Sequence, residues 1–184
     1  METNLALEQA QKISDTFDQQ RSYALSLRSS DYRERLKVLE RFEKVFNASH
    51  DKIHRAAAAD FSKSKAEVDF SEILSVVAEL KYIRKHLKSW VKPKKAMPSL
   101  MMLGTSSKIV REPRGVCLII SPWNYPFNLT FCPMMLAIAA GNTVIIKPSE
   151  LTPNMSEVIC DVVKQAFDVK EVAAFQGDAN TASY

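Results

Sequence analysis

The first half of the chain carries a helical pattern of hydrophobic and polar positions. Apolar residues recur at intervals of three, four or seven between residues 6 and 27, with Gln, Asp, Lys and Arg between them. This spacing puts apolar side chains on one face of an α-helix, where they can pack against a core. The pattern then predicts a second helix that starts at Asp31 and a third for which Ser49 is the N-cap. The predicted core residues of these two helices are Leu36, Leu39, Phe42, Phe46, Ile53, Ala57 and Phe61.

A fourth helix has the clearest start signal. Asp69 and Glu72 stand three residues apart, like a capping box in which two polar side chains pair with free backbone N–H groups at the helix start. Val68 can pack on Ile73 as a hydrophobic staple. We interpret the apolar stripes of all four helices as hydrophobic core. The predicted stripe of the fourth consists of Phe70, Ile73, Leu74, Val77, Leu80, Ile83 and Leu87.

Two short apolar runs in the second half of the chain predict a parallel βαβ unit. Residues 116–120 and 143–146 are rich in β-branched side chains and too short for helices, and a helix-length apolar segment joins them. Continuous apolar strands of this kind are buried on both faces of a parallel sheet. Pro133 lies within the joining segment, so the helix either begins near it or is kinked there. A further helix after residue 152 and a third strand at 172–175 extend the unit.

Residues 99–113 predict a β-hairpin between the helices and the sheet. Residues 100–103 and 108–111 alternate loosely around a turn. The chain therefore divides into a helical segment at 1–95, the hairpin at 96–113 and a parallel-sheet part at 114–184. We expect an α/β fold in which helices and hairpin pack on a parallel sheet.

The composition is that of a soluble globular protein. Of the 184 residues, 46% are hydrophobic and 25% are charged, as in ordinary globular domains. The three cysteines lie in apolar runs without metal-site spacing, and their odd number favours buried thiols in a reducing compartment. The N-terminus lacks the charged-then-apolar order of a signal peptide, and the longest apolar stretch is too short to span a bilayer. We predict a cytoplasmic protein with no metal and no integral membrane segment.

The charge pattern leaves two interpretations open. The net charge of +4 is too small to indicate a polyanionic partner by itself, but residues 81–95 hold seven Lys or Arg and no acidic residue. Such a run is either the solvated face of a helix with its tail or a contact for nucleic acid or an anionic membrane. Aromatic residues are scarce there and no nucleic-acid motif accompanies the charge, so we favour the solvated face and predict no nucleic-acid partner.

Polar residues follow the second strand of the βαβ unit, at the edge where open parallel sheets bind ligands. An acidic residue at this position can accept a hydrogen bond from a ribose hydroxyl, and Glu150 stands there with Lys147 beside it as a donor. Pro148 constrains the turn between them. The alternative is a surface loop whose carboxylate stabilises a helix start. The fingerprint Gly-x-Gly-x-x-Gly is absent, so the pyrophosphate of a dinucleotide must be held in another way.

The first strand ends in a rigid aromatic loop with the sequence Pro122-Trp123-Asn124-Tyr125-Pro126. The side-chain amide of Asn124 has two donors, and a fixed amide donor at the mouth of a pocket can stabilise an oxyanion. The commoner use of an asparagine at such a place is to cap the helix that follows. The residues alone leave both roles open.

Three motifs together resemble the aldehyde dehydrogenase superfamily. They are Pro122-Trp123-Asn124-Tyr125-Pro126, Ala139-Ala140-Gly141-Asn142 and Lys147-Pro148-Ser149-Glu150. The run Trp-Asn-Tyr-Pro-Phe-Asn-Leu-Thr at 123–130 is most similar to the class 3 branch, which includes the fatty aldehyde enzymes, and Glu112-Pro113-Arg114-Gly115-Val116 also fits that branch. The resemblance extends over essentially the whole chain, which covers well under half of a family member. It implies that residues 114–184 are the first part of a Rossmann-like NAD(P)-binding domain with an incomplete parallel sheet of the nucleotide-binding kind, and that the catalytic domain is absent.

The resemblance implies an oxidoreductase that converts aldehydes to carboxylic acids with NAD or NADP as cofactor. In that family a cysteine thiolate attacks the aldehyde, and a glutamate acts as the base when water hydrolyses the thioester. The resemblance implies that Asn124 donates to the oxyanion and that Lys147 and Glu150 hold the adenosine ribose. It also implies a homo-oligomer, such as a dimer, in which the hairpin is the oligomerisation element. The other residues implied to line the cofactor cleft are Ile120, Ser121, Pro122, Trp123 and Ser149.

By the same resemblance, the nucleophilic cysteine and the general-base glutamate lie beyond residue 184. Cys117, Cys132 and Cys160 fall in a strand and in apolar helical runs, where thiols are usually protonated and inert. We therefore expect a truncated chain that does not oxidise aldehydes by itself. Two other functions stay open, a non-catalytic interaction module derived from the family and, with weaker support, a basic module that binds nucleic acid through residues 81–95.

Overall fold

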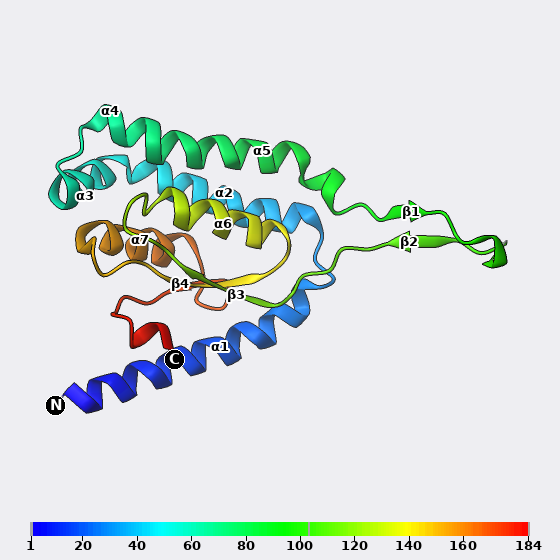
Figure 1. Cartoon of the computed structure of the whole chain (residues 1–184), viewed down its shortest axis with the longest axis horizontal. Helices are drawn as coiled ribbons and strands as arrows, with labels where there is room; N and C mark the ends of the chain where they lie inside the picture. Colours follow the sequence, from blue (N-terminus) through cyan, green and yellow to red (C-terminus); the bar gives the residue numbers. More distant parts are fainter. Residues whose placement is uncertain (1, 103, 184) are drawn as a thin grey trace.

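The protein is a layered α/β structure, seen here in a computed structural model that describes residues 2–102 and 104–183. Figure 1 shows a small twisted sheet with helix α1 on one face and the other long helices stacked on the opposite face. The helices are α1 (Glu2–Leu27), α2 (Tyr32–Ala48), α3 (His50–Phe61), α4 (Lys65–Val68), α5 (Leu74–Trp90), α6 (Asn128–Ala139) and α7 (Pro153–Ala166). The strands are β1 (Lys94–Ala96), β2 (Ser107–Ile109), β3 (Val116–Ile120), β4 (Thr143–Lys147) and β5 (Val172–Ala174).

The three strands β3, β4 and β5 form the predicted parallel sheet, in that order. Val116 pairs with Thr143 at one end of the β3–β4 ladder, and Ile120 pairs with Lys147 at the other. Strand β4 lies in the centre, and all five of its residues are buried. The α/β fold class is therefore confirmed. The prediction that both apolar runs are buried on both faces holds for β4 but is wrong for β3, where Leu118 is 60% and Ile120 57% exposed, because β3 lies at an edge of the sheet.

The main hydrophobic core lies between the sheet and the stacked helices. Phe42 of α2 packs on Phe131 of α6 with ring centroids 5.0 Å apart, and both side chains are fully buried. A smaller cluster on the other face joins β4 and β5 to Ile13 of α1. The buried Gln20 fastens α1 to the sheet, because its amide donates to the carbonyls of Val144 (3.0 Å) and Val169 (2.9 Å).

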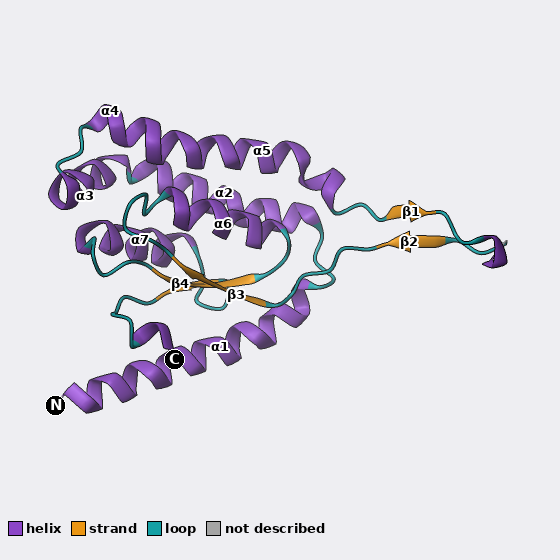
Figure 2. Ribbon diagram, viewed as in Figure 1, coloured by secondary structure: helices purple, strands orange, loops and turns teal. Residues whose placement is uncertain are grey.

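The hairpin forms, but its strands differ from the prediction: the first lies earlier, at Lys94–Ala96, and the second is Ser107–Ile109 where 108–111 was predicted. Strands β1 and β2 pair antiparallel and extend away from the body of the molecule (Figure 2). Leu100–Met102 form a 3₁₀ turn near the tip instead of the predicted first strand, and Leu103 lies outside the described residues. Met97 and Met101 are each 98% exposed there, so loose alternation of apolar residues did not mark a buried strand face. The division at residues 95 and 113 stays a prediction.

The fourth helix begins earlier than predicted, and the capping box was a wrong assignment. Ser64 is the N-cap of α4, with its hydroxyl accepting from the backbone N–H of Glu67 at 3.3 Å. Asp69–Ile73 form a π-helical turn that leads into α5. A π turn holds extra residues per turn and shifts the face of the helix that follows. Phe70 is consequently 75% exposed and Leu74 53% exposed, although both were predicted to be buried.

Helix α6 and the turn that leads from it to β4 account for Pro133, Gly141 and Asn142. Helix α6 begins at Asn128 and runs through Pro133, so the proline is inside the helix and not at its start. Gly141 follows with φ +89°, a conformation that favours glycine, and a Cβ there would lie 2.7 Å from the Arg35 guanidinium carbon. The Asn142 side chain accepts hydrogen bonds from the N–H groups of Arg114 (2.7 Å) and Gly115 (2.9 Å), which fastens the entry of β3.

Candidate functional site

The two polar strand ends lie next to each other at one edge of the sheet. Because Ile120 pairs with Lys147, the residues that follow β3 and β4 emerge side by side. The N–H of Ser121 donates to the carbonyl of Lys147 at 3.0 Å, which joins the two segments directly. The loop that bears the predicted oxyanion donor and the turn that bears the predicted ribose-binding pair thus start side by side, at the edge where parallel sheets bind ligands.

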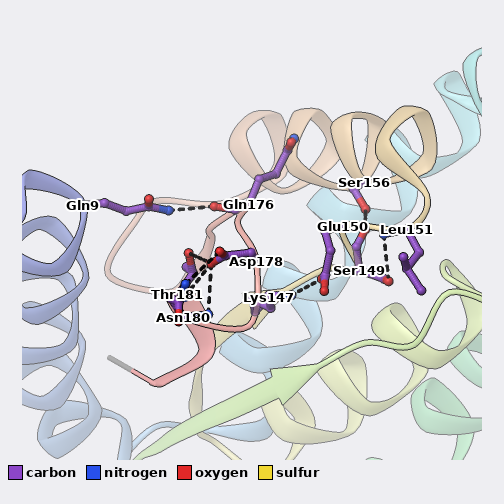
Figure 3. Close-up of polar contacts among 10 residues, drawn as sticks. All are labelled: Gln9, Lys147, Ser149, Glu150, Leu151, Ser156, Gln176, Asp178, Asn180 and Thr181. Atoms are coloured by element: carbon purple, nitrogen blue, oxygen red, sulfur yellow. Dashed lines mark hydrogen bonds and ion pairs between the residues drawn. The ribbon is translucent and has the colours of Figure 1, made fainter. Parts of the chain in front are cut away.

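Lys147 and Glu150 form an ion pair at the end of β4 (Figure 3). The Lys147 side chain is 8% exposed and that of Glu150 is 45% exposed, so the pair spans the boundary between the protein interior and solvent. The hydrogen bond from Lys147 lowers the pKa of the Glu150 carboxyl below its ordinary value. Glu150 is therefore a carboxylate at neutral pH, with one side open to a further hydrogen-bond donor.

The start of α7 is stabilised by a different carboxylate. Asp60, from α3, accepts hydrogen bonds from the N–H groups of Asn154 (3.3 Å) and Met155 (2.8 Å). Glu150 instead pairs with Lys147, so the helix-start role that the sequence left open for Glu150 belongs to Asp60. The Lys147–Glu150 pair therefore does not cap the start of α7.

Ser149 has a structural place within the turn. Its side chain is turned inward, with the hydroxyl accepting from the N–H of Leu151 at 3.3 Å and the residue only 7% exposed (Figure 3). Its carbonyl accepts from the hydroxyl of Ser156 at 2.6 Å. These bonds hold the turn in a single shape, and the predicted contact of Ser149 with a cofactor stays a prediction.

The loop after β3 is more exposed than the turn after β4. Ser121 is buried and accepts a 2.6 Å hydrogen bond from the hydroxyl of Thr130. The residues beyond it face solvent, with Trp123 52% exposed and Asn124 also exposed. Ile120, at the end of the strand, is 57% exposed, and Pro122 is exposed as well. The loop therefore presents an aromatic ring and an amide at the rim of the sheet.

The start of α6 is capped by Glu72, a residue whose role the sequence did not reveal. One of its carboxylate oxygens accepts hydrogen bonds from the N–H groups of Phe127 (3.1 Å) and Asn128 (2.9 Å). Glu72 is fully buried, and this burial raises the pKa of its carboxyl. Asn124 is therefore not the cap of this helix. The sequence offered no signal for this contact, because the pattern of Asp69 and Glu72 is that of a local capping box.

The two capped helices explain how this sheet departs from a standard dinucleotide fold. In that fold the pyrophosphate sits on the free N–H groups at the start of the first helix after a strand. Here Glu72 occupies those groups in α6 and Asp60 occupies them in α7. A carboxylate at each position would repel a phosphate, which agrees with the absence of the glycine fingerprint from the sequence.

A groove of about 300 Å³ lies beside Lys147, on the α1 face of the sheet. Its walls are mainly apolar and include Phe17, Val116, Leu118 and Phe175. Ligand pockets are commonly lined in this way, with few polar groups to orient the ligand, and their volumes begin at about 300 Å³. Lys147 provides a polar group of that kind at the edge of this groove.

Residues 3–181 match the aldehyde dehydrogenase family. The chain belongs to the aldehyde dehydrogenase family. It is 38% identical over 165 residues to 4,4'-diaponeurosporen-aldehyde dehydrogenase of Staphylococcus aureus, which covers 90% of the chain and 36% of that relative. It is 39% identical over 144 residues to aldehyde dehydrogenase family 3 member A2 of Pongo abelii, covering 78% of the chain and 30% of that relative. The class 3 resemblance of the sequence is thereby confirmed.

The fold agrees with a solved family structure over almost all of the chain. Staphylococcus aureus AldH in a substrate-bound state superposes with a TM-score of 0.89 at 36% identity, and the match covers 92% of this chain and 37% of that one. The chain thus corresponds to the N-terminal part of an aldehyde dehydrogenase and spans about a third of the length of these relatives.

The cysteines of this aldehyde dehydrogenase chain are poor candidates for a nucleophile. Cys117, Cys132 and Cys160 are free thiols, and burial raises the pKa of each. The pKa of Cys132 rises to about 11. A thiol must lose its proton to attack a carbonyl, so these groups are suited to packing more than to catalysis.

The basic stretch at residues 81–95 is divided between α5 and the hairpin. Arg84 is paired, since its guanidinium donates to Glu43 at 2.5 Å and lies 3.4 Å from Glu40. This pairing of opposite charges is typical of a helix face that is exposed to solvent. Within residues 2–102 and 104–183, no cluster of three His, Cys, Asp or Glu could hold a metal ion, and no helix is long and apolar enough to cross a membrane.

Proposed function

We propose that this chain forms the NAD(P)-binding part of an NAD(P)-dependent aldehyde dehydrogenase that oxidises aldehydes to carboxylic acids. The observation that carries the proposal is the Lys147–Glu150 ion pair at the end of β4. No described helix start uses this pair, and it lies beside the loop that bears Asn124. Family membership supplies the reaction class, and this geometry supplies residues with the chemistry that the reaction needs.

The ion pair fits a ribose with two neighbouring hydroxyl groups. The Glu150 carboxylate can accept from one hydroxyl, and the Lys147 ammonium can donate to the other. Lys147 is already held in place by its buried position, so little ordering is needed on binding. Ile120, Ser121, Pro122, Trp123 and Ser149 would border the rest of the cofactor. Bound NAD or NADP would supply the acceptor for the hydride that leaves the substrate.

Asn124 is proposed to donate a hydrogen bond to the oxyanion that forms when an aldehyde carbonyl is attacked. Its exposed amide stands at the rim of the sheet beside the cofactor residues. A preorganised donor of this type is worth about 3 kcal/mol of barrier in other enzymes. The aldehyde is the proposed substrate, and the hairpin, with its exposed methionines, is the proposed contact in a homo-oligomer.

Residues 1–184 alone are proposed not to turn over aldehydes, because none of the three thiols is activated. NADH formation from a medium- or long-chain aldehyde by the purified polypeptide would contradict this. Replacement of all three cysteines by serine would then show whether one of them is responsible.

Titration with NAD tests the cofactor site directly. In a Trp90→Phe background, Trp123 is the remaining tryptophan, and saturable quenching of its fluorescence by NAD is expected. Glu150→Gln should weaken binding about tenfold, the loss of roughly one hydrogen bond to a charged group. Glu157→Gln, an exposed glutamate on α7, is the matched control and should leave the affinity unchanged. Absence of saturable quenching, or an equal effect of the control, would refute the proposal.

A further inference from the structure

The loop that carries Asn124 is held by residues from the connection between α3 and α5. The Lys63 ammonium donates to the backbone carbonyl of Asn124 at 3.2 Å. This contact joins residues that are 61 positions apart in the sequence. It restrains the peptide unit immediately after Asn124 without using the side chain of that residue.

The two aromatic neighbours of Asn124 are held by Phe61, the last residue of α3, and by Lys63 just after it. Trp123 stacks on Phe61 with ring centroids 6.4 Å apart and an interplanar angle of 28°. The Lys63 ammonium lies 5.0 Å from the centre of the Tyr125 ring and 4.5 Å from that of Phe61. A cation over an aromatic face is attracted to it, so Lys63 joins the Tyr125 ring to the segment that also carries Phe61.

The far end of the loop is fastened by the π turn. Glu72 accepts from the N–H groups of Phe127 and Asn128, and the Asn128 amide donates to the carbonyl of Ser71 at 3.4 Å. At the near end, Ser121 is bonded to Lys147 and Thr130. The loop is thus fixed before, beside and after Asn124. The Asn124 amide itself forms no hydrogen bond with any residue in the described ranges and stays open to a ligand.

We propose that Lys63 is a positioning residue for Asn124, with Glu72 anchoring the helix behind the loop. By holding the Asn124 carbonyl and the Tyr125 ring, while Phe61 holds the Trp123 ring, Lys63 and its neighbour fix the backbone from which the Asn124 amide projects and leave its donors free. Preorganised donors stabilise developing charge because they need no reorientation during the reaction. This inference rests on the proposed function of Asn124, and it adds that residues far away in the sequence set the geometry of the site.

NMR relaxation of the ¹⁵N-labelled 184-residue chain tests the inference without cofactor or substrate. In the unmodified protein, the amides of Trp123, Asn124 and Tyr125 should have order parameters of about 0.85, as in rigid backbone. Lys63→Met, which keeps the length of the side chain and removes its charge, should lower them to below about 0.6. Amides of β4 should keep their values, because a loss confined to the loop separates positioning from a general loss of stability.

Two further variants make the result decisive. Lys63→Arg keeps the cation and a donor and should restore the loop to rigid values. Lys65→Met removes an exposed lysine at the start of α4 and should leave the loop unchanged. If the loop of Lys63→Met is as rigid as that of Lys65→Met, or if arginine does not restore it, the inference is wrong. The NAD titration can fail while this result stands, and the reverse also holds, so the two proposals are tested separately.

Discussion

The turn after β4 and the loop after β3 lie side by side, but they are held in place by different means. The β4 turn is stabilised mainly by its own neighbours, with Lys147 bonded to Glu150 and Ser149 bonded to Leu151 and Ser156. The β3 loop depends on Lys63 and on Glu72, which come from a segment more than fifty residues earlier in the chain. The ribose-binding half of the proposed site is thus local, whereas the oxyanion half is made by tertiary contacts.

The caps of the following helices show the same contrast. Asp60, which caps α7, is partly exposed, whereas Glu72, which caps α6, is fully buried. One Glu72 oxygen accepts both hydrogen bonds, and the other is buried without a partner among the described residues. A buried cap excludes water as a substitute, so its loss should cost more than the loss of an exposed one.

The largest expected effect comes from the two caps. Glu72→Ala should lower the free energy of unfolding by about 2–3 kcal/mol, because two backbone N–H groups lose their acceptor in a buried position. Asp60→Ala should lower it by about 1 kcal/mol, since water can replace an exposed cap. Urea denaturation of both variants measures the difference.

Glu67→Ala is the control for these variants, because Glu67 is an exposed glutamate in the same region. Its effect should stay within about 0.5 kcal/mol. Equal losses of unfolding free energy in Glu72→Ala and Asp60→Ala would contradict the distinction between the buried cap of α6 and the partly exposed cap of α7.

Lys147→Met should separate binding from stability. The affinity for NAD is expected to fall about tenfold, equal to about 1.4 kcal/mol, because the ribose loses a donor. The free energy of unfolding should change less than in Glu72→Ala, since Met keeps the apolar stem of the buried lysine and the Glu150 carboxylate that loses its partner is 45% exposed to water. Fluorescence titration and urea denaturation give the two values. Asn124→Ala should leave the affinity for NAD unchanged. A tenfold loss of affinity in this variant would contradict the separation of the ribose-binding residues from the oxyanion donor.

The carboxyl groups of Glu72 and Glu150 should respond to pH in opposite directions. Burial raises the pKa of Glu72, so its contribution to stability is present below about pH 4.5, its value in the unfolded chain, and is lost as the pH rises through the folded pKa. Lys147 lowers the pKa of Glu150, so its contribution is present above about pH 4.5 and is lost as the pH falls through the folded pKa.

Urea denaturation of the Glu72→Gln and Glu150→Gln variants across this range measures both slopes. The stability advantage of the unmodified chain over Glu72→Gln should shrink with rising pH. Its advantage over Glu150→Gln should shrink with falling pH. If the two differences in unfolding free energy changed in the same direction with pH, the opposite shifts in pKa of Glu72 and Glu150 would be contradicted.

The smallest expected effect concerns the choice between NAD and NADP. A carboxylate near the ribose repels a 2′-phosphate, so Glu150→Gln should improve the affinity for NADP relative to NAD by about two- to fivefold, the range of exposed charge pairs. Parallel titrations with both dinucleotides measure the ratio. An unchanged ratio would mean that Glu150 does not face the 2′ position of the ribose.

The sequence by itself determined the features that depend on neighbouring residues. The short apolar β-branched runs marked β3 and β4 as strands, but only the central strand β4 is fully buried. Asp31 was correctly predicted to start α2, where its carboxylate accepts from the N–H of Arg33 at 2.7 Å. Family membership could also be predicted from short motifs such as Lys147-Pro148-Ser149-Glu150, because a mostly local turn requires its residues to stand next to one another in the sequence.

Only the tertiary structure decided how the two halves of the site are supported. Glu72 matched a capping box by spacing, yet it caps a helix that begins 56 residues later. The π turn moved Phe70 to the surface, although its spacing is that of a core residue. Nothing in the neighbourhood of Lys63 indicated that it would hold the carbonyl of Asn124. Local spacing describes contacts within one element, whereas these contacts depend on how separate elements pack, which a single sequence pattern does not encode.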